Sequence, residues 1–227
     1  MKEPEGDNAI ERSSQDPEID EPQDEIGERS ATDGAGALHG ADDPREFRLK
    51  HSDEFVEPMS RARSVEQFQD PRSNAERVNP DYALDMSNKV NCADCARCYE
   101  ATWRGQEQEA AGRAYQIGSS GGLEVTGEPP EMTEEWAHEE FKATSPGELR
   151  QALEQGGHGS SAIIGSQFED GAHAYNAVNY HGEILTVDPQ SGEVHPYSDE
   201  SIHPLLEGYQ DVTHETMAWD SSGRRIL

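Results

Sequence analysis

The sequence predicts an α+β domain that follows a disordered acidic leader. Three helix-like segments lie between residues 91 and 155, and three short strand-like segments follow between residues 161 and 187. Helices first and strands afterwards is an order typical of α+β folds. The apolar content of 32% is below the roughly 45–50% of ordinary globular domains, which indicates that part of the 227-residue chain adds little to a core.

The N-terminal stretch, residues 1–44, is the part predicted to be disordered. It holds 14 acidic residues, three basic residues and no aromatic residue. Such a composition buries too little apolar surface to offset the entropy of ordering the chain. Residues 45–78 regain three phenylalanines but show no sustained period, so we expect a partly helical linker there.

The segment 91–105, NCADCARCYEATWRG, predicts a helix with Asn91 as its N-cap and Gly105 as its stop. Cys92 would lie in the first turn, where the helix dipole favours the thiolate form of a cysteine. Four side chains at helical spacing share a face that we expect to be buried: Cys95, Cys98, Tyr99 and Thr102.

The other elements follow from periodicity and turn residues. Two more helices are predicted over residues 131–142 and 145–155. Three strands are predicted as an antiparallel meander over residues 161–168, 173–179 and 183–187. We expect the domain to span residues 79–200 and residues 201–227 to be an irregular C-terminal extension with no assigned function.

The formal net charge of −29 argues against binding of nucleic acid through a basic face. No window approaches the roughly 18 consecutive apolar residues of a membrane span, and the start MKEPEGDNAI lacks the features of a secretory signal. We therefore expect a soluble protein that is cytoplasmic as made. Two explanations of the acidic composition stay open. One is adaptation to high salt, and the other is an ordinary acidic protein that uses Arg in preference to Lys.

Three cysteines within seven residues allow three interpretations. A metal cluster would need a fourth ligand that is not a cysteine, because the chain holds no other cysteine. A disulfide would need an oxidising compartment. Cys95 and Cys98 are most simply small buried hydrophobic residues, whereas Cys92 has the position of a nucleophile.

A nucleophilic cysteine needs a base, and His173 is the histidine with an acid partner. A hairpin that turns near residues 180–182 places His173 opposite Asp188 on the next strand. The acid can then hold the imidazole in the tautomer that accepts the thiol proton. The alternative is a surface histidine beside a turn aspartate.

Three separated motifs together resemble the papain-like-fold toxin domains of bacterial polymorphic and phage-associated toxins, the toxin glutamine deamidase family. They are the NC-x-x-C helix start, the strand G-x-H-A-x-N-A-V-x-x-x-G and the terminal DPQ-x-G, and VNPDY upstream also matches. The resemblance covers about residues 79–197. It implies a papain-like fold with the cysteine-bearing helix packed on a short antiparallel sheet.

The resemblance also implies roles for individual residues. Cys92 matches the family's nucleophile, His173 its general base and Asp188 the residue that orients the histidine. Asn91 and Gln190 are candidates for holding the oxyanion and the substrate. The implied activity needs no metal and no organic cofactor. Its partners would be a protein with an accessible glutamine and an immunity or carrier protein.

Other activities fit the same residues. A cysteine peptidase or a transglutaminase would use the same triad and the same acyl-enzyme intermediate. In a third alternative, the fold is a non-catalytic acidic interaction protein in which Cys92 is inert and the leader docks a basic partner.

Overall fold

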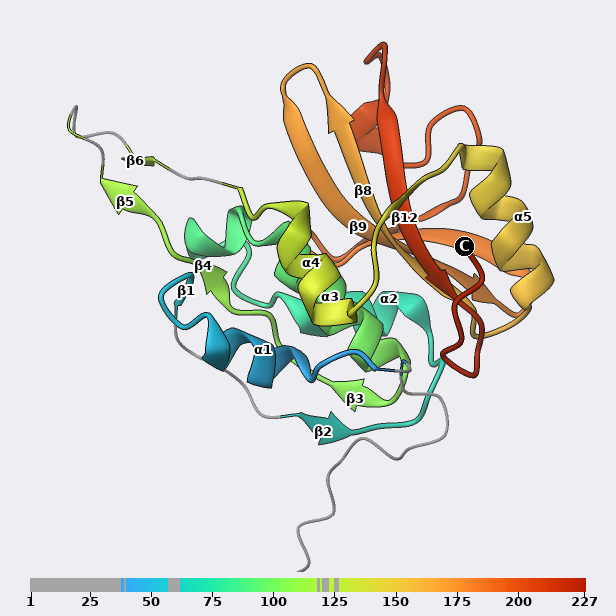
Figure 1. Ribbon diagram of the computed structural model, residues 1–227, viewed down its shortest axis with the longest axis horizontal. Helices are drawn as coiled ribbons and strands as arrows, with labels where there is room; N and C mark the ends of the chain where they lie inside the picture. The colour runs from blue at the N-terminus through green and yellow to red at the C-terminus, as the bar shows by residue number, and fades with distance from the viewer. Residues whose placement is uncertain (1–37, 39, 57–61, 118, 120–122, 125–126) are drawn as a thin grey trace, which may run out of the picture. The chain divides into compact units, whose positions relative to one another are not determined.

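The computed structural model describes residues 38, 40–56, 62–117, 119, 123–124 and 127–227, which belong to one compact unit, Thr32–Leu227 (Figure 1). The predicted acidic leader lies outside the described residues as far as residue 37, so its disorder there stays a prediction. The prediction is wrong at residues 43 and 44, because Asp43 caps a helix that begins at Pro44. The predicted mixture of helices and strands is confirmed for the described residues.

A six-stranded antiparallel sheet lies at the centre of this unit, larger than the short sheet expected from the sequence. In spatial order its strands are β11 (Glu193–Pro196), β10 (Glu183–Asp188), β9 (Gly171–Tyr180), β8 (Ser161–Phe168), β12 (Thr213–Trp219) and β7 (Lys142–Ala143). Strands β8, β9 and β10 form the predicted meander.

The expectation of an irregular C-terminal stretch is wrong for residues 213–219. These residues form β12, which pairs with β8 along its whole length and also with β7. The final residues of β12 are buried one after another, Met217, Ala218 and Trp219, because both faces of the sheet are covered there. This segment lacks the alternation of apolar and polar residues that marks a half-buried strand.

Five α-helices and two 3-10 helices surround the sheet within the described residues. They are α1 (Pro44–Lys50), α2 (Pro71–Val78), η1 (Ser87–Lys89), α3 (Cys92–Trp103), α4 (Pro130–Ala137), α5 (Pro146–Gly156) and η2 (Pro204–Leu206). Three further two-strand ladders pair β1 (Phe55–Val56) with β4 (Gly112–Arg113), β2 (Arg63–Ser64) with β3 (Gln106–Glu107), and β5 (Gln116–Ile117) with β6 (Leu123–Glu124).

The predicted helices are present, with one corrected boundary. α3 and α5 match the prediction, and Ser145 begins α5 with a capping box that includes Glu148. α4 ends at Ala137 rather than continuing to residue 142. His138 adopts a left-handed conformation with φ 54°, which stops the helix.

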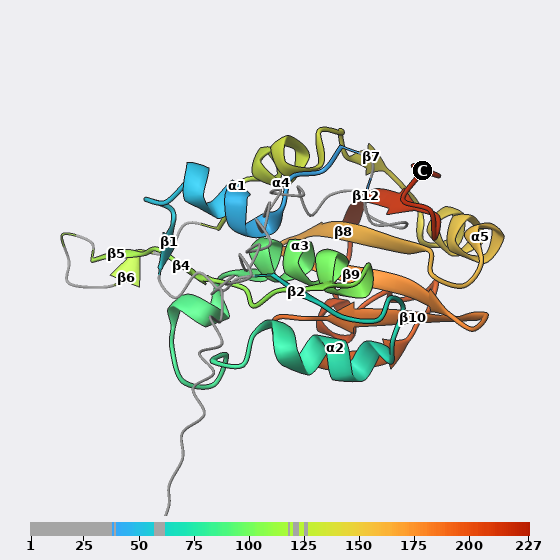
Figure 2. The ribbon, with the colours of Figure 1, turned by 90° about the horizontal axis from the view of Figure 1, so that it is seen from below.

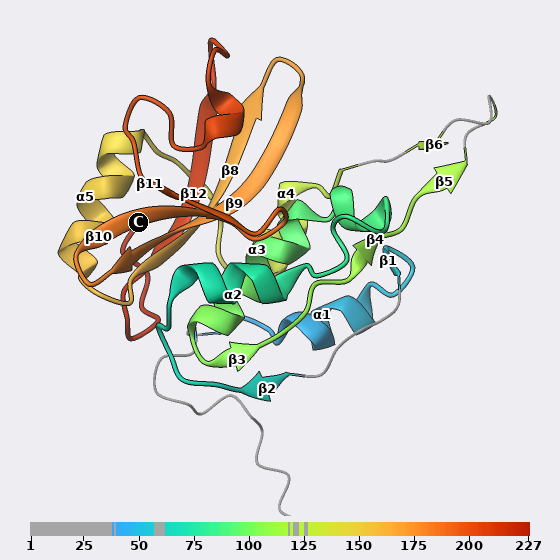
Figure 3. The same cartoon turned by 180° about the vertical axis from the view of Figure 1, so that it is seen from behind.

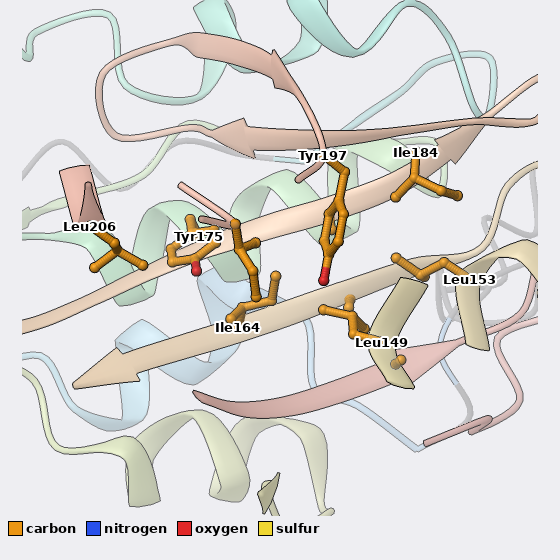
Figure 4. Close-up of a cluster of buried hydrophobic side chains, with 11 residues drawn as sticks. Leu149, Leu153, Ile164, Tyr175, Ile184, Tyr197 and Leu206 are labelled. Carbon is orange, nitrogen blue, oxygen red and sulfur yellow. The ribbon is translucent and has the colours of Figure 1, made fainter. Parts of the chain in front are cut away.

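Helices cover both faces of the sheet (Figures 2 and 3). α5 packs on one face, where Leu149 and Leu153 meet Ile164, Tyr175 and other buried side chains (Figure 4). α3 packs on the other face against β9 and β8, together with α2. This packing fixes the N-terminus of α3 near one end of the sheet.

The expected partly helical linker contributes to the core. It includes α2 and nearly all of α1, and Phe47 and Val78 in these helices are fully buried. α1 is also tied to α3 by a buried ion pair between Arg48 and Asp94, with 3.2 Å between Nη1 and Oδ2.

None of the helices in the described residues is both long and apolar enough to cross a lipid bilayer.

Candidate active site

Cys92 is the first residue of α3 and is partly exposed, whereas Cys95 and Cys98 further along the helix are fully buried. Burial raises the pKa of Cys95 well above its usual value and that of Cys98 to about 12. All three thiols are free. Cys92 is therefore the cysteine that combines access to solvent with a helix N-terminus.

Asn91 precedes the helix but its side chain does not cap it. That side chain is buried, and its amide nitrogen donates to the Ala111 carbonyl at 3.0 Å and to Asn79 Oδ1 at 3.3 Å. The cap comes from Gln190. With the amide oxygen of Gln190 turned toward the helix, it accepts the N–H of Asn91 at 3.1 Å and of Cys92 at 3.0 Å.

The hairpin between β9 and β10 turns over two residues, His181 and Gly182, which both have positive φ. The predicted turn was centred one residue earlier. In the observed register Val187 faces Asn176. Asp188 is therefore offset by two residues from the position opposite His173 that the sequence predicted. A shift of two keeps side chains on the same face of a strand.

His173 and Asp188 therefore still meet, diagonally across the hairpin. His173 Nε2 lies 3.2 Å from Asp188 Oδ2, and both side chains are buried. The Cys92 thiol lies close enough to the same imidazole to raise its pKa. Because Nε2 donates to the carboxylate, Nδ1 is the nitrogen that can take the thiol proton.

The electrostatics of the pair follow from these contacts. Burial lowers the pKa of His173, but hydrogen bonds with Asp188 and Cys92 and their charges raise it more, to about 10. Burial likewise disfavours the charged form of Asp188, yet its hydrogen bonds with histidines hold its pKa well below the usual range. The site thus favours an imidazolium beside a carboxylate.

The loop after β10 is fixed by hydrogen bonds to Asp188 and Asn79. Asp188 Oδ1 accepts the Gln190 N–H at 3.0 Å, and Oδ2 accepts the Ser191 hydroxyl at 3.0 Å. Asn79, just after α2, donates from Nδ2 to the Gln190 carbonyl and to the Asn88 carbonyl, both at 2.8 Å. Asn79 therefore joins the DPQ loop to the segment that leads into Cys92.

Two site residues were not identified as such from the sequence. Asn79 belongs to the VNPDY motif, which gave a signal but no role. His203 was assigned to the irregular C-terminal stretch, yet its Nε2 lies 3.4 Å from Asp188 Oδ2. No local pattern marks it, because an irregular segment between β11 and β12 carries it to the site.

Ligand atoms of His173, Asp188 and His203 lie within 4.8 Å of one another, so this group could hold a metal ion. It is the group of that kind within the described residues, and it contains none of the three cysteines. The same closeness places the Asp188 carboxylate beside two imidazoles, and it hydrogen-bonds with that of His173.

The arrangement can perform nucleophilic catalysis. A cysteine at a helix N-terminus contacts an imidazole, and a buried carboxylate orients that imidazole from its other nitrogen. This is the set of groups used for acyl transfer through a thioester.

Comparison with known proteins yields one family. Residues 90–193 match the family model described as papain fold toxin 1, glutamine deamidase, which is a little under half of the chain. The matched segment contains Cys92, His173, Asp188 and Gln190, and it ends before His203 and β12. No curated protein and no solved structure matches the chain significantly.

Proposed function

We propose, from the membership of residues 90–193 in the papain-fold toxin glutamine deamidase family, that this protein is a cysteine-dependent deamidase of protein glutamine. The observation that carries the proposal is the imidazole of His173, which contacts Cys92 on one side and Asp188 on the other. The substrate is a protein with an accessible glutamine side chain.

In the proposed reaction, the imidazolium of His173 holds the proton that came from the Cys92 thiol, and the sulfur attacks the carboxamide carbon of glutamine. The carbon–nitrogen bond breaks, and His173 returns the proton to the leaving nitrogen, which departs as ammonia. Water then attacks the thioester while His173 accepts its proton, and the carbon–sulfur bond breaks. Glutamine and water are converted to glutamate and ammonia, and Cys92 is restored.

Asp188 keeps the Nε2–H of His173 engaged throughout, so that Nδ1 faces the sulfur. The developing oxyanion needs donors, and the Cys92 N–H is the nearest by position in the chain. Gln190 holds that N–H in the free protein, so we expect its amide to release it when substrate enters. The contacts of Asn91 favour a supporting role in place of the oxyanion role expected from the sequence.

Peptidase and transglutaminase activity use the same intermediate and are separated by their products. The full chain would be expressed in bacterial cells as wild type, as Cys92→Ala and as Cys95→Ala. We expect a mass increase of about one dalton at specific glutamines with wild type and Cys95→Ala, and a loss of about a thousandfold or more with Cys92→Ala.

Cys95→Ala is the matched control because Cys95 lies on the same helix but is buried away from solvent. Backbone cleavage that depends on Cys92 would replace the deamidase assignment by a peptidase, and a cross-link to amines by a transglutaminase. Modification that persists in Cys92→Ala would overturn the proposed nucleophile.

A further inference from the structure

Asp188 lies between two imidazoles. Its Oδ2 atom is 3.2 Å from Nε2 of His173 and 3.4 Å from Nε2 of His203. The proposed reaction uses only His173, and His203 comes from the N-cap of η2, outside the residues matched by the family. The second imidazole therefore has no role in the reaction as described so far.

The hydrogen-bonding roles of the two ring nitrogens of His203 follow from one contact. The Leu205 N–H donates to His203 Nδ1 at 3.0 Å, so Nδ1 is an acceptor and Nε2 is the ring nitrogen that can donate. The side chain is buried, and no aligned hydrogen-bond partner of Nε2 is found among the described residues. Asp188 is the acceptor within reach, at the long end of the hydrogen-bond range.

Packing keeps the His203 ring in place. Its centroid is 4.8 Å from the Tyr175 ring and 5.3 Å from the His173 ring, and His195 on β11 is 6.4 Å away. With Asp188 on β10, these are the titratable groups that face it from the strands packed against η2. The ring therefore has little freedom to turn away from the carboxylate.

We propose that His203 is a positioning residue, which holds Asp188 so that Asp188 in turn holds His173 toward Cys92. The inference rests on the proposed function. The Gln190 N–H, the Ser191 hydroxyl and His173 hydrogen-bond with Asp188, and the His203 ring packs beside it with Nε2 at 3.4 Å, so the carboxylate keeps one orientation. Without His203, Asp188 loses this polar neighbour, and the His173 imidazole loses part of its support.

Two substitutions test separately whether the side chain at position 203 must reach Asp188 and whether it must accept the Leu205 N–H. His203→Asn keeps a side-chain acceptor for the Leu205 N–H but is too short to reach Asp188. His203→Gln has an amide nitrogen that can reach the place of Nε2. Both variants keep a polar side chain at the cap, and thermal unfolding followed by circular dichroism shows whether each folds.

The probe is iodoacetamide, applied to the full chain, with alkylation of Cys92 followed by peptide mass spectrometry and buried Cys95 and Cys98 as internal controls. At pH 7 we expect His203→Asn to slow alkylation of Cys92 about tenfold and His203→Gln to stay within about twofold of wild type. At pH 10 the rates should converge, because cysteine thiols there ionise without a base.

The proposal would be overturned if His203→Asn were alkylated at the wild-type rate at pH 7. It would also be overturned if the rate were lowered equally at both pH values, since that result indicates a change of access or fold. A full further effect of His203→Asn in an Asp188→Asn background, where no orientation of Asp188 is left to lose, would overturn it as well. The expected pattern together with an absence of deamidation would leave His203 its role and overturn the deamidase assignment instead.

Discussion

At the scale of single residues, folding brings together a charged pair, the imidazole of His173 and the carboxylate of Asp188. His173 is buried between Asp188 and Cys92, and these partners raise its pKa to about 10 from an ordinary value of about 6.5. A group whose pKa is raised on folding stabilises the fold most where it is protonated in both states. That contribution is present below about pH 6.5 and is lost as the pH rises toward 10.

We therefore expect the free energy of unfolding of wild type to fall, relative to His173→Gln, between pH 6.5 and pH 10. The expected change in the difference is of the order of a few kcal/mol. Urea denaturation at several pH values measures it, and His195→Gln on β11 is the control at a more exposed histidine. A wild-type to His173→Gln difference that stays constant over this range would contradict the raised pKa.

At the scale of elements, α3 depends on a buried ion network as much as on apolar packing. Asp94 in its first turn contacts Arg48 of α1 and Arg97 of α3, and all three side chains are fully buried. Asp94 Oδ2 also accepts the Ala111 N–H at 2.9 Å, and Arg48 donates to Cys98 Sγ at 2.9 Å. Removal of Asp94 would leave two guanidinium groups with less compensation inside the core.

For this reason we expect Asp94→Ala to destabilise the protein by about 3–5 kcal/mol. Asp199→Ala is the matched control, because Asp199 forms an exposed pair with Arg150 and should cost about 0–1 kcal/mol. Chemical denaturation compares the two. Equal effects of the two substitutions would mean that the buried network contributes no more than a surface pair.

Sequence periodicity predicted the helices and strands that have local sequence signals, whereas tertiary packing determined the remaining ones. The helix of Cys92 and the three-strand meander follow from caps, turns and alternation. The hairpin register was missed by two residues because His181 takes a positive φ that glycine usually supplies. β12 joins the sheet through long-range pairing with β8, and His203 reaches the site on an irregular connection. No local pattern encodes either placement.

At the scale of the whole molecule, the dominant property is the net charge of −29. Among the described residues, the buried arginines are already paired, Arg48 and Arg97 with Asp94, Arg104 with Glu100 and Arg113 with Glu128. Among the described residues, most other acidic side chains are at least partly exposed. Surface charges of one sign repel one another and oppose the compact state, whereas buried pairs are shielded from dissolved ions.

Salt should therefore stabilise this protein. Between about 0.01 M and 1 M salt the Debye length falls from about 30 Å to about 3 Å, so repulsion between surface carboxylates is screened while the buried pairs keep their attraction. We expect the melting temperature to rise over this range in sodium chloride, measured by circular dichroism, and to rise less with an equal osmolarity of glycerol. A melting temperature that is flat or falls with salt would show that repulsion is not what limits stability, and would remove the argument for adaptation to high salt.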